Sequence, residues 1–143
     1  VNWWSAAGDN GGVHTNSGVQ NFWYYLLTDG GSGTNDNSDS YNVNGLGFDD
    51  AGAIAYRNLS VYLTEWSQYS DARFYSIQSA IDIFGFCTPE VESTTNAWYA
   101  AGVDPAYSSV VIADFTTPIT TSFSFVSCTL TVSCILYSPL RAQ

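Results

Sequence analysis

Apolar side chains recur every three or four residues in four stretches of the chain, which is the spacing of one face of an α-helix. The stretches run from about residue 17 to 28, 49 to 65, 70 to 84 and 88 to 101. Their apolar faces are, in chain order, Val19, Phe22, Trp23, Leu26 and Leu27; Ala51, Ile54, Ala55, Leu59, Tyr62 and Leu63; Phe74, Ile77, Ile81 and Phe84; and Val91, Trp98 and Ala101. Helices this short are marginal alone, so we expect them to pack together. The pattern predicts a mainly α fold, a compact bundle of four to five helices with a short β-like C-terminal tail.

Residues at the ends of these stretches are of the types that begin or end helices. Asp49 and Asp50 suit the start of the second helix, and Ser70 is expected to cap the third. Thr88 is expected to cap the fourth helix, with Pro89 at its first helical position. Glycines follow the first, third and fourth helices, as expected of stop signals.

The remaining segments have other patterns. Residues 30–47 are rich in Gly, Asn, Ser and Asp, which predicts a polar loop with a hairpin near residues 41–46. From Phe123 to Leu136, apolar residues alternate with Ser and Thr, with one break, as in β-strands. We therefore divide the chain into a helical domain, residues 1–103, and a tail, residues 104–143. The tail is either the start of a truncated β module or a segment that pairs elsewhere, because two strands alone are not stable.

The charge balance excludes several classes of partner. The chain has 3 basic and 13 acidic residues, a net charge of −10, and no Lys. Nucleic-acid binding needs clustered Lys and Arg, and anionic membrane surfaces attract cations, so we expect neither partner. No apolar run approaches the roughly 20 residues of a membrane span. The acidic, Lys-free composition, rich in Asn, Gly, Ser and Thr, is typical of a secreted, extracellular protein.

Met, His and Cys are scarce. The absence of Met, even at position 1, predicts a processed piece, a domain cut from something larger or an incomplete reading. A single His excludes a two-His metal site built from this chain alone. The cysteines, Cys87, Cys128 and Cys134, fit neither a metal clip nor a full disulfide framework. Cys128 and Cys134 could pair across a turn or stay reduced.

The segment most suggestive of chemistry runs from Gly8 to Gly18, with the sequence GDNGGVHTNSG. Asp9 lies five residues before His14, and Gly11 and Gly12 permit a tight turn between them. Such a turn would bring the Asp9 carboxylate to one ring nitrogen of His14 and leave the other nitrogen facing outward. An oriented imidazolium can donate to a developing oxyanion. The alternative is an ordinary loop histidine that makes a hydrogen bond and has no catalytic role.

Longer runs of the sequence resemble a known family. The segments DNGGVHTNSGVQNFWYYLL, GLGFDDAGAIAYRNLSVYLT, YSDARFYSIQSAIDIFG and TPEVESTTNAWYAAGV resemble, in this order, the C-terminal helical domain of thermolysin-like neutral zinc metallopeptidases. The resemblance covers about residues 9–103 and does not extend into the tail. In that family the motif His donates to the tetrahedral intermediate and the motif Asp orients it. The resemblance therefore implies that His14 and Asp9 are catalytic residues.

The same resemblance implies that part of the active site lies elsewhere. The family binds zinc through an H-E-x-x-H helix and a later Glu, with the helix Glu as general base. These residues, and an Arg that contacts the substrate carbonyl, precede the DNGGVH motif in the family and do not occur in this chain. The chain alone is therefore expected to hold no zinc and to be inactive. Its expected partners are the missing N-terminal zinc-binding half and peptide or protein substrates.

Other groups of residues in the sequence could form sites of different kinds. Oxygen atoms of Asp36, Asn37 and Asp39 could bind calcium, which many of these enzymes contain, although a solvated loop fits these residues better. Glu65 with Asp71 and Glu90 with Glu92 are possible carboxylate pairs, but we interpret them as helix-end residues. The glycosylation sequon at Asn58 is interpreted as a chance match within a helix. Aromatic residues could form a sugar-binding platform, but core packing and a seam against the missing half fit them better. These aromatic residues are Trp3, Trp4, Trp23, Tyr24 and Tyr25.

The sequence thus predicts the C-terminal catalytic-domain portion of a secreted zinc metalloendopeptidase. Its contribution would be a histidine that stabilises the tetrahedral intermediate of peptide-bond hydrolysis. The alternative hypothesis is a non-catalytic binding, structural or self-assembling module derived from that domain. An H-E-x-x-H motif in the sequence upstream would favour the peptidase.

Overall fold

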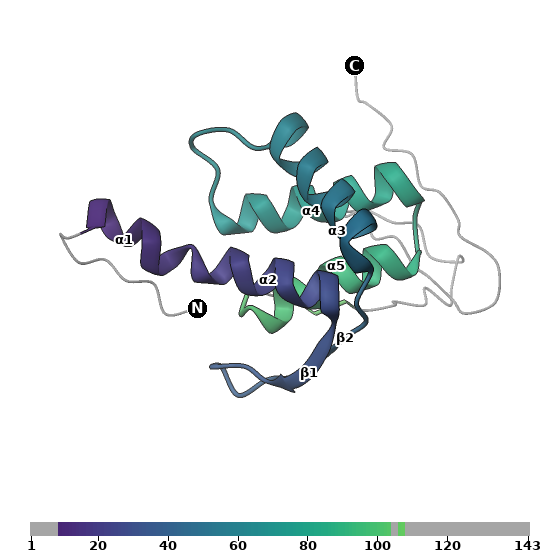
Figure 1. The fold of residues 1–143 in the computed structure, drawn as a ribbon, viewed down its shortest axis with the longest axis horizontal. Coiled ribbons are helices and arrows are strands. Elements are labelled where there is room, and N and C mark those ends of the chain that lie inside the picture. The colour runs from purple at the N-terminus through teal and green to yellow at the C-terminus, as the bar shows by residue number, and fades with distance from the viewer. Residues whose placement is uncertain (1–8, 104–105, 108–143) are drawn as a thin grey trace, which may run out of the picture. The chain divides into compact units, whose positions relative to one another are not determined.

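The computed structural model describes residues 9–103 and 106–107. These residues belong to the first of two compact units, Val1–Tyr107. The helices are α1 (Asp9–Asn16), α2 (Gly18–Asp29), α3 (Gly47–Arg57), the π-helix η1 (Asn58–Tyr62), α4 (Tyr69–Phe84) and α5 (Pro89–Ala100). Two short strands, β1 (Gly31–Thr34) and β2 (Ser40–Val43), separate α2 from α3. The predicted mainly α fold is confirmed, and each predicted helical stretch contains a helix (Figure 1).

Two stacked tryptophans form the centre of the core. The rings of Trp23, on α2, and Trp98, on α5, lie 4.7 Å apart between centroids and 18° from parallel. The Trp98 indole Nε1 donates a hydrogen bond to Ser76 Oγ, on α4, at 2.7 Å, so its polar atom is satisfied inside the core. Buried aliphatic residues from α2, α3, α4 and α5 surround the stack. One pair of rings therefore links three of the helices.

Helices α4 and α5 approach each other through small side chains. Ala72, Ser76, Ser79 and Ala80 are buried on α4, as are Ser93, Thr94, Thr95 and Ala97 on α5. The Ser and Thr hydroxyls mostly donate to carbonyls of their own helix, which satisfies them where they are buried. The predicted face of α4 is therefore wrong at Phe74, whose side chain is 61% exposed. The apolar pattern points to the large residues, whereas this helix packs by its small ones.

The second predicted helix changes geometry before it ends. It begins at Gly47, and at Asn58 the α-helix becomes a π-helix, in which Leu63 N donates to Asn58 O at 3.0 Å. Asn58 lies four residues after the buried Ile54 and continues the buried face of α3, where its Nδ2 donates to the Ala72 carbonyl at 3.1 Å. Leu59 occupies the next position around the helix and is 67% exposed, so the prediction that it lies on the apolar face is wrong.

The start of α4 also differs from its prediction. The N-cap is Gln68, two residues before Ser70, and Asp71 accepts a hydrogen bond from the Gln68 backbone N–H at 2.8 Å. The side chain of Gln68 makes the reciprocal bond, which completes a capping box. At α5, Thr88 is the N-cap and Pro89 the first helical residue, as predicted. Phe22 of α2 is predicted to face the core. Its side chain lies instead at the edge of the core and packs against the ring of Tyr41.

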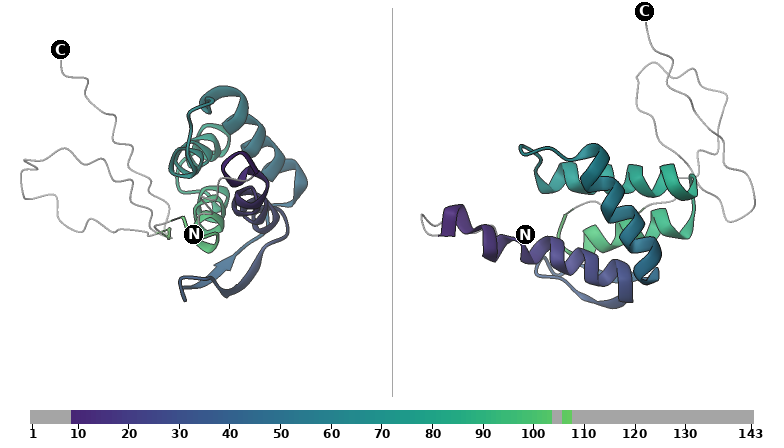
Figure 2. Two further views of the ribbon diagram at one scale, coloured as in Figure 1. Left: turned by 90° about the vertical axis from the view of Figure 1, so that its left-hand side faces the viewer. Right: turned by 45° about the horizontal axis from the view of Figure 1, so that its top comes forward.

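The loop between α2 and α3 contains an antiparallel hairpin in which Gly31 pairs with Val43 and Thr34 with Ser40. It lies along one side of the bundle (Figures 1 and 2), where β2 packs against α5. Its tip is closed by Asn35 Oδ1, which accepts the backbone N–H groups of Asn37 and Asp39, each at 3.0 Å. At its base the chain passes so close to α2 that a Cβ on Gly45 would lie 2.5 Å from the carbonyl carbon of Asp29. Only glycine fits there.

Several predictions fall outside the described residues. They include the strand pattern of residues 104–143, the domain boundary that this pattern implies, and the pairing of Cys128 with Cys134. Cys87, which follows α4, is disulfide-bonded. Within the part of the chain that the structure describes, no helix is long and apolar enough to cross a membrane.

Candidate active site

The motif that contains Asp9 and His14 begins with a left-handed turn. The φ angles of Asp9, Asn10, Gly11 and Gly12 are 57°, 48°, 84° and 82°. Glycine adopts this region freely, and Asp and Asn tolerate it better than other residues. From Val13 the backbone turns right-handed and leads almost end to end into α2 (Figure 1). The predicted tight turn is present, although the sequence did not predict the helical residues that follow it.

The Asp9 carboxylate holds His14 at two points. Oδ2 accepts the backbone N–H of His14 at 2.9 Å, and Oδ1 is in hydrogen-bond contact with the ring atom Nδ1. With the carboxylate at Nδ1, that nitrogen carries the proton, so Nε2 is an acceptor in the neutral ring and a donor in the imidazolium. The contact between Asp9 and His14 is the one that the spacing predicted.

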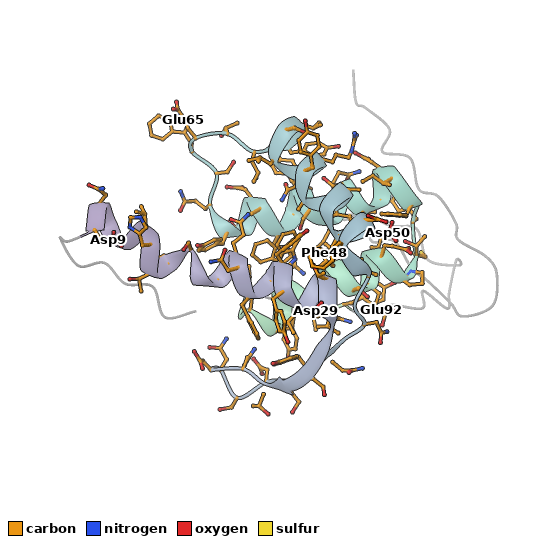
Figure 3. The ribbon with its side chains drawn as sticks, in the orientation of Figure 1. Asp9, Asp29, Phe48, Asp50, Glu65 and Glu92 are labelled. Atoms are coloured by element: carbon orange, nitrogen blue, oxygen red, sulfur yellow. The ribbon has the colours of Figure 1, made fainter. Side chains whose placement is uncertain are left out.

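The rest of the His14 ring faces solvent. Its side chain is 86% exposed, against 35% for that of Asp9, and Nε2 has no hydrogen-bond partner among the described residues. Figure 3 shows Asp9 at the far end of α1, away from the packed helices. A substrate or another segment of protein could therefore reach Nε2 without any movement of the bundle.

The electrostatics of the pair favour the ionised carboxylate. The hydrogen bond from the His14 ring lowers the pKa of Asp9 below its ordinary value of 3.8, against a smaller opposing effect of burial. The backbone N–H groups of His14 and Thr15 lower this pKa further. Asp9 thus presents a negative charge to the His14 ring at neutral pH.

The turn is tied to the bundle by side chains beyond the pair itself. Asn16 Nδ2 donates to the Gly11 carbonyl at 3.3 Å, and Ser17 Oγ donates to the His14 carbonyl at 2.8 Å. The hydroxyl of Tyr69, at the start of α4, donates to the Asn16 carbonyl at 2.5 Å. No spacing in the sequence indicates the Tyr69 contact, because 53 residues separate its partners.

The other sequence-predicted sites are not assembled in the described part of the chain. No three His, Cys, Asp or Glu side chains lie together there in a way that could hold a metal ion, and this includes the acids of the hairpin tip. Asp71 caps α4, while Glu90 and Glu92 lie in the first turn of α5, as interpreted from the sequence. Asn58 is buried, so its sequon is not accessible.

The aromatic residues divide between core and surface. Trp23 is buried, Tyr24 is half-buried and Tyr25 is exposed, while Trp3 and Trp4 lie outside the described residues. A groove of about 630 Å³ runs between α2, α3 and η1. Phe48, Tyr56 and Leu59 line it with exposed apolar surface. Among its lining residues are also Trp23 and Asn58, whose Nε1 and Oδ1 atoms are buried and have no partner among the described residues.

A second charged cluster was missed by sequence reasoning. Arg57 donates two hydrogen bonds, from Nε at 3.0 Å and from a terminal nitrogen at 2.7 Å, to Oδ2 of Asp82 on α4. The Tyr62 hydroxyl donates to the same oxygen, and Gln78 Nε2 donates to Oδ1 at 2.8 Å. Burial raises the pKa of Asp82, but these hydrogen bonds together lower it below 3.8. No spacing in the sequence indicates this cluster, since its members come from different elements.

Comparisons with known proteins cover most of this domain. Residues 2–103 match the family model described as the thermolysin metallopeptidase alpha-helical domain. Over 95 residues the chain is 45% identical to the thermostable neutral protease NprT of Geobacillus stearothermophilus, with 66% of this chain and 16% of that protein covered. Over the same shares it is 44% identical to a thermolysin of Alicyclobacillus acidocaldarius subsp. acidocaldarius. It is 39% identical over 101 residues to a bacillolysin of Bacillus cereus, covering 71% of this chain and 17% of the relative.

Proposed function

This chain belongs to the family of the thermolysin metallopeptidase alpha-helical domain, and from that premise we propose that it is the C-terminal catalytic-domain portion of a secreted zinc metalloendopeptidase. The family resemblance found in the sequence is confirmed by the match over residues 2–103. Because the chain spans only 16% or 17% of the relatives compared, the activity of the complete protein is part of the proposal.

In this proposal His14 stabilises the oxyanion of the tetrahedral intermediate in peptide-bond hydrolysis. The protonated ring donates from Nε2 to the developing negative charge, and Asp9, bonded at Nδ1, fixes the ring orientation. The observation that carries the proposal is the Asp9 carboxylate bound to both the backbone N–H and the ring of His14, with Nε2 facing outward.

The proposal includes zinc because the chain belongs to a family of metallopeptidases. The described residues do not fit a zinc ion, since no group of three suitable side chains is found among them. We therefore assign no step of the reaction to the metal, and we expect its ligands in the upstream half of the complete protein. The 143-residue chain by itself should hydrolyse no peptide, with or without added zinc. We extend the proposal to calcium in the complete protein, although the hairpin-tip acids form no metal group with other described residues.

The upstream half is also the proposed partner of the groove between α2, α3 and η1. The groove exposes aromatic and aliphatic side chains, which is unusual for a surface that stays in contact with water. Secretion is supported by the disulfide bond of Cys87, because such bonds persist in oxidising environments.

Replacement of His14 in the complete protein tests the function. We expect His14→Ala to lower kcat by about 10²- to 10³-fold with little change in KM, because the interaction forms mainly in the transition state. The control is Asn42→Ala, at an exposed position of β2 outside the groove, which should leave both constants unchanged. An unchanged kcat in His14→Ala would remove His14 from the mechanism.

A non-catalytic binding or structural module is the second candidate, and the exposed apolar groove is the observation that favours it. The two functions differ in the sequence that precedes this domain. An in-frame H-E-x-x-H motif followed by a Glu supports the peptidase. Its absence from the complete coding sequence would leave the module as the better interpretation.

A further inference from the structure

Tyr69 is the side chain of α4 that reaches the motif turn. Its hydroxyl donates to the Asn16 carbonyl at 2.5 Å, and its ring lies 6.4 Å from that of Trp98, between centroids. Burial raises the pKa of Tyr69, so the hydroxyl stays protonated and remains a donor at neutral pH. One residue thus contacts both the core stack and the last residue of α1.

Asn16 connects the residue that Tyr69 holds to the left-handed part of the turn. It is buried, and its side-chain amide donates to the carbonyl of Gly11 at 3.3 Å. Gly11 lies between Asp9 and His14, so the position of its peptide group determines how the carboxylate meets the ring. The contacts run in order from Trp98 through Tyr69 and Asn16 to the turn.

We propose that Tyr69 is a positioning residue for His14, holding the motif turn in the geometry in which Asp9 orients the imidazole. The inference rests on the proposed role of His14 and adds a residue remote in sequence. Among the described residues, Tyr69 makes no hydrogen bond to Asp9 or His14. It acts through the Asn16 backbone. Its hydroxyl joins the packed helix α4 to an exposed turn that contains two glycines.

The test is Tyr69→Phe in the complete protein, which removes one oxygen atom and keeps the ring. We expect kcat to fall by about 5-fold with KM unchanged, the effect of losing roughly one net hydrogen bond from the geometry of the site. The matched control is Tyr75→Phe, on the same helix, whose ring stacks on Tyr62 and whose hydroxyl makes no hydrogen bond among the described residues. It should leave kcat unchanged.

A purely structural role for the hydroxyl would give a different result. In that case Tyr69→Phe lowers the melting temperature but leaves kcat, measured well below melting, equal to that of Tyr75→Phe. A second readout is the pKa of the Asp9 carboxyl, followed by carbon NMR in the 143-residue chain. Loosening of the turn should move this pKa upward toward 3.8 in Tyr69→Phe and not in Tyr75→Phe.

Each outcome decides between the two proposals. If His14→Ala lowers kcat and Tyr69→Phe does not, the positioning role is wrong and the function stands. If neither variant changes kcat, the function itself is wrong. Should Tyr69→Phe fail to fold, Asn16→Asp replaces it, because this change keeps the size of the side chain and removes the donor to Gly11. An unchanged kcat in Asn16→Asp would also overturn the inference.

Discussion

Asp9 and Asp82 are two aspartates in similar chemical surroundings whose partners are arranged differently. Each accepts several hydrogen bonds, and each has a pKa below 3.8. The partner of Asp9 lies five residues away in its own turn, and the histidine that it holds is left facing solvent. Asp82 instead receives Arg57 and Tyr62 from the end of α3 and from η1, which are 25 and 20 residues away.

The two clusters differ in whether an atom of the partner side chain still faces outward after the hydrogen bonds are made. At Asp82 the donors of Arg57, Tyr62 and Gln78 converge on the carboxylate, so the cluster links elements of the fold. At Asp9 the carboxylate uses one ring nitrogen of His14 and leaves the other outward. A lowered carboxyl pKa is thus common to both clusters, and the two differ in the outward ring nitrogen of His14, on which the proposed function depends.

The largest expected contrast is in activity. In the complete protein, Asp9→Asn should lower kcat about 10- to 100-fold, as for other groups that orient a reacting side chain. Asp82→Asn should leave kcat unchanged, because Asp82 contacts no part of the motif. Steady-state kinetics of the two variants measure this difference. Equal losses of kcat in the two variants would contradict the distinction between the two clusters.

A smaller contrast of opposite sign is expected in stability. Asp82→Asn should lower the melting temperature of the 143-residue chain by a few degrees, since it weakens contacts between the end of α3, η1 and α4. Asp9→Asn should lower it less, because its contacts lie within one exposed turn. Thermal unfolding followed by circular dichroism compares the two variants. A greater loss in Asp9→Asn would contradict the assignment of Asp82 as the structural carboxylate.

The smallest expected effect is the dependence of this stability on pH. Because the folded pKa of Asp82 is depressed, its contribution is present above the unfolded value of 3.8 and is lost as the pH falls through the folded pKa. The difference in melting temperature between wild type and Asp82→Asn should therefore shrink when the pH is taken well below 3.8. A difference that stays constant through this range would show that the charge of Asp82 contributes nothing.

Local features were predictable from the sequence, and remote ones were not. Apolar periodicity located α2 and α5, and the Gly pair indicated the turn that joins Asp9 to His14, because both signals come from neighbouring residues. The π-helix at Asn58, the convergence on Asp82 and the Tyr69 contact depend on how the helices pack. Amphipathic spacing also favours large residues, which is why it pointed to Phe74 where α4 buries small side chains.

The stacked indoles of Trp23 and Trp98 have an optical consequence. The two indole rings lie 4.7 Å apart between centroids, close enough for their ultraviolet transitions to couple, and the angle between the transition dipoles within the rings sets the size of the resulting pair of circular-dichroism bands. One ring comes from α2 and the other from α5, and the signal therefore exists only while the two helices are together. The domain thus carries its own unlabelled reporter of assembly.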